Sequence, residues 1–61
     1  MANRVLNKQL NAKLEELRDR PNTTYNRGIL HGFLLAIMTE GKIDRSEAQD
    51  ILEQFGEKPT V

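Results

Sequence analysis

Residues 28–38 read Gly-Ile-Leu-His-Gly-Phe-Leu-Leu-Ala-Ile-Met, and they form the densest cluster of large apolar side chains in this 61-residue chain. On a helical wheel at about 100° per residue, these apolar side chains cover well over half of the circumference. A helix of this kind needs cover on more than one side, whereas a surface helix has a single apolar stripe. The rest of the chain therefore has to pack around this segment.

Small residues recur along the same segment, because Gly28, Gly32 and Ala36 lie four residues apart. Each glycine inside a helix costs about 0.5 to 1 kcal/mol relative to alanine, so an isolated helix gains nothing from them. A strip of small residues does let another backbone approach closely. The strip therefore predicts a helix contact, although Gly28 can also be read as the mark of a late helix start.

The segment upstream carries a seam of leucines. They are spaced by four, four and three residues, as Leu6, Leu10, Leu14 and Leu17. This spacing predicts an amphipathic helix over about residues 4–18, with Asn3 as its N-cap. Pro21 ends the helix, since proline cannot donate a backbone hydrogen bond and pushes the preceding residue out of the helical region.

The central helix is predicted to run from about residue 23 to residue 40. Asn22 or Thr23 can cap its start, and Gly41 can supply the left-handed conformation that is common just after a helix.

A third helix is predicted over about residues 45–55. Ile43, Asp44 and Glu47 match a hydrophobic N′ residue, an N-cap and a capping-box glutamate. Gly56 is expected to follow this helix as its C′ residue, and the tail over residues 57–61 is expected to be frayed.

These segments predict an all-α fold, with one small three-helix domain over residues 1–61. The second and third helices form an antiparallel hairpin, and the N-terminal amphipathic helix packs beside it. A chain this short buries little surface, and without cysteine it has no disulfide to stabilise it. We therefore expect a homodimeric helical bundle in which the first or the second helices pair across a two-fold axis. The candidate dimer interface is Leu10, Leu14, Leu17, Gly28, Gly32, Phe33 and Ala36.

Catalytic chemistry is not expected from this sequence. It has no cysteine and no Ser-His pair with a third orienting group, so covalent catalysis lacks its components. The carboxylates of the third helix are spaced as a solvated surface, whereas a general acid needs a pocket that raises its pKa. We expect no enzyme activity, no cofactor and no metal site.

The formal net charge is zero, and no long apolar run is present. No overall field therefore draws in a nucleic acid or an anionic membrane, and residues 29–38 are too short to span a bilayer. The N-terminal residues also lack the apolar run of a signal peptide. We expect a cytoplasmic protein without a membrane partner.

Polar and amphipathic groups on the central helix predict a protein-binding surface, formed by Tyr25, Arg27, His31 and Met38. Such a mixture is common at binding hot spots, and it is also the ordinary boundary between core and solvent. His31 is interpreted either as a partly buried structural residue or as a partner-binding or pH-sensing group. The function we expect is a small regulatory protein that homodimerises and binds or inhibits an unidentified protein. Its size suggests an accessory protein of the kind found among very small bacterial or phage proteins.

The alternative is a small DNA- or RNA-binding regulator. Two helices joined by a glycine-containing turn resemble the outline of a helix-turn-helix. The third helix would however approach the polyanion with four acidic residues against one basic residue. A basic surface could instead come from Arg4, Lys8, Arg18, Arg20 and Arg27.

Overall fold

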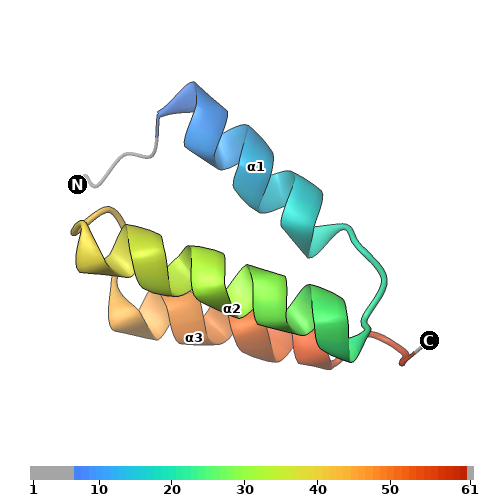
Figure 1. Ribbon diagram of the computed structural model, residues 1–61. Helices are drawn as coiled ribbons and strands as arrows, with labels where there is room; N and C mark the ends of the chain where they lie inside the picture. Colours follow the sequence, from blue (N-terminus) through green and yellow to red (C-terminus); the bar gives the residue numbers. More distant parts are fainter. Residues whose placement is uncertain (1–6, 61) are drawn as a thin grey trace.

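The computed structural model describes residues 7–60 and is all-helical, with three helices in these residues: α1 (Lys8–Arg18), α2 (Thr24–Thr39) and α3 (Arg45–Gly56). Figure 1 shows α2 and α3 side by side and antiparallel, while α1 lies at an angle above them. Among these residues there is one isolated β-bridge, which is parallel and joins Asn22 to Thr60. The predicted three-helix fold is therefore confirmed.

The first helix begins later than predicted. Asn7 has an extended backbone, and its Oδ1 accepts a hydrogen bond from the Leu10 amide at 2.8 Å, which makes Asn7 the N-cap. Asn3 and Leu6, the predicted cap and the first leucine of the seam, lie outside the described residues.

The turn between α2 and α3 follows the prediction for Gly41. Its φ of +78° is left-handed, and the amides of Gly41 and Lys42 donate to the carbonyls of Met38 (2.9 Å) and Ile37 (2.8 Å). This pair of bonds is the Schellman arrangement, which satisfies carbonyls at the helix end. Thr23, one of the two predicted caps, accepts from the Asn26 amide at 3.0 Å at the other end of α2.

Gly41→Ala should lower the free energy of unfolding by about 1 kcal/mol, because a Cβ in the left-handed region crowds the following carbonyl. Gly56→Ala is the matched control. Gly56 has no positive φ, and a Cβ there meets nothing within 4 Å. Urea unfolding of both variants checks the prediction. Equal midpoints for the two variants would contradict it.

Two details at the ends of α3 differ from the predictions. Asp44 occupies the N-cap position, but its side chain makes no capping hydrogen bond. The start is instead fixed by the apolar pair Ile43 and Ala48, both of which are buried. Gly56 is the last helical residue, with an ordinary backbone, so its assignment as a left-handed C′ residue is wrong.

The core lies where all three helices meet. Its buried apolar residues are Leu14, Leu17, Leu30, Leu34, Ile37, Ile43, Ala48, Ile51 and Phe55. Ile29, Phe33 and Met38 of α2 are half-buried against this cluster. One chain thus covers a wide arc of the central helix with α1 and α3, which is more than the sequence led us to expect.

The C-terminal segment is held against the connection between α1 and α2, and Figure 1 shows the two side by side. Asn22 is only 3% exposed, and its Nδ2 donates to the carbonyls of Lys58 (2.7 Å) and Gly56 (3.4 Å). We call this set of contacts, together with the backbone bridge from Asn22 to Thr60, the Asn22 clasp. The prediction of a frayed tail is therefore wrong for residues 57–60, and Val61 lies outside the described residues.

Lys58 strengthens the same junction from the other direction. Its Nζ donates to the carbonyls of Arg18 (2.6 Å) and Arg20 (2.8 Å), and it lies 4.6 Å from the centroid of the Phe55 ring. The ammonium group thus satisfies carbonyls at and just beyond the C-terminal end of α1, where positive charge is favourable. Together, the contacts of Asn22 and Lys58 fix residues 56–58 to the C-terminal end of α1 and to the connection that follows it.

Candidate interaction surfaces

The side of α2 that faces away from the core carries no charge. It consists of Tyr25, Gly28, Gly32, Leu35 and Ala36, all of which are exposed, and we call it the α2 outer face. Tyr25 is 76% exposed and Leu35 44%, the largest exposed apolar side chains described. A Cβ added at Gly28 or Gly32 would meet nothing within 4 Å. Within residues 7–60, the chain places no neighbour against the small residues of this face.

The predicted dimer interface is divided by the fold. Leu14 and Leu17 are buried in the core of their own chain, while Leu10 and Phe33 are half-buried against it. The exposed remainder is the small-residue strip of Gly28, Gly32 and Ala36. The leucine seam therefore serves the fold of one chain, and the strip is the part that is accessible to a second one.

The predicted partner surface is also divided. Tyr25 belongs to the α2 outer face, whereas Arg27, His31 and Met38 lie on the side of α2 next to α3. His31 is exposed, so its interpretation as a partly buried structural residue is wrong. Because His31 follows Arg27 by four residues, the guanidinium group and the imidazole ring lie on the same edge of α2.

That edge forms a groove with α3. One hollow of about 200 Å³ and a more open one of about 480 Å³ share His31 and Leu52 and take all their lining from α2 and α3. We call this the α2–α3 groove. Its main lining residues are Arg27, His31, Leu35 and Met38 from α2, and Arg45, Gln49 and Leu52 from α3.

Sequence reasoning missed the α3 side of this groove. Arg45, Gln49, Leu52 and Gly56 follow one another at helical spacings of four, three and four residues, which is the signal that they share an edge. That spacing does not say which edge of α2 they lie beside. The register between the two helices was needed to connect them with Arg27 and His31.

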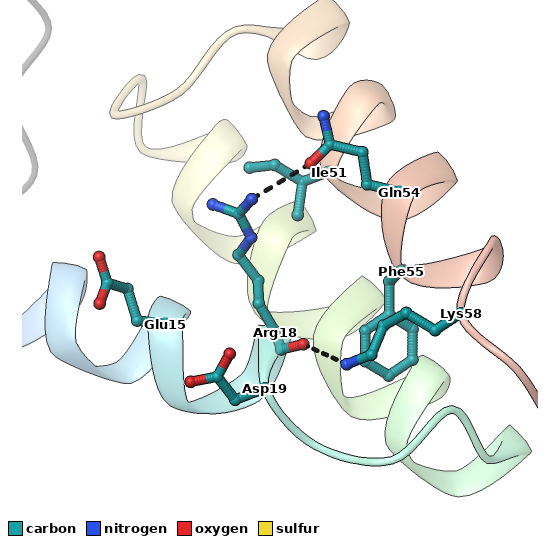
Figure 2. A pocket seen from close by; sticks show the side chains of 7 residues that line it. All are labelled: Glu15, Arg18, Asp19, Ile51, Gln54, Phe55 and Lys58. Carbon is teal, nitrogen blue, oxygen red and sulfur yellow. Dashed lines mark hydrogen bonds between the residues drawn. The ribbon is translucent and has the colours of Figure 1, made fainter. Parts of the chain in front are cut away.

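A second cleft lies between the end of α1 and α3, and Figure 2 shows its lining. It encloses about 440 Å³ above Ile51 and Phe55, with Glu15, Arg18, Asp19, Gln54 and Lys58 around it. The Arg18 Nη2 donates to the Gln54 Oε1 at 3.2 Å, and Lys58 is held by the carbonyls at the end of α1 (Figure 2). Two basic and two acidic groups balance in charge here, and both basic groups already join parts of the fold.

The basic residues of the nucleic-acid hypothesis do not gather on one surface. Lys8 and Arg18 lie at opposite ends of α1, about 15 Å apart along its axis. Arg27 lines the α2–α3 groove, to which α1 contributes nothing, and Arg4 lies outside the described residues.

Arg20 is engaged in an ion pair. Its Nε donates to the Glu16 Oε2 at 2.7 Å, and this hydrogen bond holds the pKa of Glu16 below its ordinary value. The stabilisation from this pair is present above the pKa of Glu16 in the unfolded chain and is lost as the pH falls through its lower value in the folded chain. Arg20 therefore neutralises an acidic neighbour on α1 and adds little to a basic surface.

Across residues 7–60, no three His, Asp or Glu side chains are placed to hold a metal ion together. None of the helices in that range combines the length and the apolarity needed to cross a bilayer. No protein-family model, curated protein or solved structure matches this chain.

Proposed function

We propose that this protein is a non-enzymatic cytoplasmic regulator that forms a homodimer through the α2 outer face and binds a protein partner. The observation that carries the proposal is the composition of that face. It combines two exposed large apolar side chains, Tyr25 and Leu35, with three small residues and no charge. Exposed groups of this kind mark contact surfaces when they are contiguous.

The glycines support helix pairing in particular. Gly28 and Gly32 weaken α2 by about 0.5 to 1 kcal/mol each relative to alanine, and residues 7–60 use neither for close packing. Two α2 helices that cross at this strip could approach closely about a two-fold axis. Tyr25 would then pack beside the crossing and lose contact with water, and Leu35, which also lines the α2–α3 groove, would lie between the crossing and that groove. A second chain would thus account for the cost of the glycines.

Lack of enzyme activity is supported by the charged groups of the cleft at the end of α1. Arg18 and Lys58 are both bound to groups of the fold, to Gln54 and to backbone carbonyls respectively. A catalytic acid or base needs a side chain that is within reach of a substrate and has a shifted pKa. Both basic groups of this cleft are thus used in a structural junction.

Gly32→Leu separates the dimer from the fold of one chain. We expect dimer affinity to fall at least about tenfold, because a leucine would hold the two helices apart, while the stability of the monomer rises by up to about 1 kcal/mol. Sedimentation between low-micromolar and millimolar concentrations gives the affinity, and urea unfolding of the dilute protein gives the stability.

Gly56→Ala is the control, because Gly56 belongs to α3, whereas the proposed helix crossing lies along α2. It should leave the dimer affinity unchanged. A folded wild-type protein that stays monomeric at millimolar concentration would refute the dimer, as would equal association of the two glycine variants.

A further inference from the structure

The α2–α3 groove has the dimensions of a peptide site. Its smaller hollow, about 200 Å³, lies below the range of about 300 to 1,000 Å³ that is usual for small-molecule pockets, and its larger hollow, about 480 Å³, lies within that range but is more open. Leu34, Leu35, Met38 and Leu52 line it, so it offers apolar surface to one or two side chains at a time. From Arg27 to Met38 the groove follows α2 for about 16 Å, or three helical turns. A short helix could lie along it with successive apolar side chains in the hollows.

The formal charges along the groove have one sign. Arg27 and Arg45 are exposed beside the apolar floor, together with the polar His31, and no carboxylate lines either hollow. Glu53, which follows Leu52, lies about 100° further round α3 and outside the lining. This is unusual for a chain whose nine basic and nine acidic residues balance.

Most of the other basic side chains of residues 7–60 are engaged within the fold, although Lys8 and Lys42, like the two arginines of the groove, form no ion pair there. Lys13 and Arg20 pair with Glu16, and Arg18 and Lys58 are bound at the end of α1. Neither Arg27 nor Arg45 forms an ion pair with a carboxylate of residues 7–60, and the Arg27 Nη2 reaches only the Thr24 hydroxyl, at 3.5 Å. Their guanidinium groups are therefore accessible to carboxylates from outside, which they can bind in a bidentate manner.

We propose that the α2–α3 groove binds an acidic amphipathic helix of a partner protein. The apolar residues of that helix, spaced i, i+4 and i+7, would enter the hollows, and its carboxylates would pair with Arg27 and Arg45. A nucleic acid would use the arginines but not the apolar floor, so a helix fits both features of the groove. The proposal rests on the proposed protein-binding function and names the chemistry of the partner.

The probe is a fluorescein-labelled peptide of about 15 residues with leucines at i, i+4 and i+7 on one face and glutamates on the other. A second peptide carries lysine at every glutamate position. Anisotropy titrations with the whole protein at about 50 mM salt should give a Kd at least about tenfold lower for the glutamate peptide, because surface charges are weakly screened at that salt. Equal affinities for the two peptides, or binding of neither, would overturn the proposal.

The variant Arg27→Glu/Arg45→Glu should raise the Kd of the glutamate peptide at least about tenfold. Lys8→Glu/Lys13→Glu makes the same change in net charge on α1, and it should change the Kd less than about twofold. If the two double variants raised the Kd equally, the effect would come from the overall charge of the protein, and the proposed site in the groove would be refuted. Circular dichroism of each variant confirms that α-helical structure is retained.

A labelled DNA duplex is the third probe. Tighter binding of this duplex than of the glutamate peptide, lost in Arg27→Glu/Arg45→Glu, would overturn the proposal in favour of a nucleic-acid site.

The outcomes also separate the proposed groove site from the proposed protein-binding function and from the homodimer. A captured partner that binds the wild type and Arg27→Glu/Arg45→Glu equally well would leave the proposed function intact and place its site away from the groove. Peptide binding by a chain that stays monomeric would refute the dimer alone.

Discussion

Replacing Leu30 with alanine should unfold a large fraction of the molecules at 37 °C. Leu30 is fully buried (0% exposed) where α2 meets the other helices, and the substitution removes apolar contacts and leaves a cavity. Such changes cost about 2 to 5 kcal/mol. A protein of this length has a total stability of only about 3 to 9 kcal/mol. The loss is therefore comparable with the whole stability of the fold.

Leu35→Ala is the matched control, because it makes the same chemical change on the same helix at a side chain that is 44% exposed. In dilute solution, where the protein is monomeric, it should cost less than about 1 kcal/mol. Thermal and urea unfolding followed by circular dichroism measures both. If Leu30→Ala lost no more stability than Leu35→Ala, the position of the core would be wrong.

Asn22→Asp should be the most damaging change outside the apolar core. It removes the Nδ2 donor that binds the carbonyls of Gly56 and Lys58, and it places a carboxylate next to two carbonyl oxygens in a buried position. The Oδ1 of Asn22 has no hydrogen-bond partner within residues 7–60, so no donor described there already binds the oxygen at which part of the added charge would lie. We expect a loss of about 2 to 4 kcal/mol at pH 7.

The pH dependence of Asn22→Asp has a definite sign. Burial and the neighbouring carbonyls should raise the pKa of the introduced carboxyl in the folded state above the unfolded value of about 3.9. A raised folded pKa means that stability is highest below the unfolded pKa and is lost as the pH rises through the folded pKa. The protonated carboxyl can also donate to the Lys58 carbonyl. The variant should therefore approach the stability of the wild type near pH 4 and fall behind it near pH 7.

Asn22→Ala provides the comparison, because alanine does not titrate. Its difference from the wild type should be about 2 kcal/mol and should stay constant between pH 4 and pH 7. Subtracting the wild-type curve removes the contribution of other carboxylates, including Glu16. A parallel pH dependence for the two variants would show that the introduced carboxyl is not buried, and the Asn22 clasp would then be misplaced.

Local signals predicted the helices well. Pro21 and Gly41 stop α1 and α2 by backbone chemistry that acts within a few residues, and the apolar spacing around Ala48 and Ile51 identifies α3. The sequence predicts a start of α1 near residue 4, whereas the helix begins at Lys8, because Asn3 and Asn7 are equally good N-caps in sequence. The choice between them depends on how far α1 reaches along α2, which is a tertiary property.

The surfaces were harder to predict, because they depend on how the helices are placed in space. The Asn22 clasp joins groups that are 34 to 38 residues apart, and a single asparagine in a turn gives no sign of such a partner. The α2–α3 groove depends on the register that brings Leu52 beside His31. The helical wheel of α2 shows how wide its apolar surface is, but it does not show how much of that surface other helices cover. Leu17 of α1 and Phe55 of α3 cover much of it.

The contacts of Lys58 also bear on the order in which the chain matures on the ribosome. Synthesis delivers α1 first, and the carbonyls of Arg18 and Arg20 stay hydrated until an ammonium group made some 40 residues later reaches them. The hairpin of α2 and α3 must have closed by then, since it is what returns the chain to its starting end. The bonds from Lys58 to the end of the first helix can therefore form only after residue 58 has left the exit tunnel.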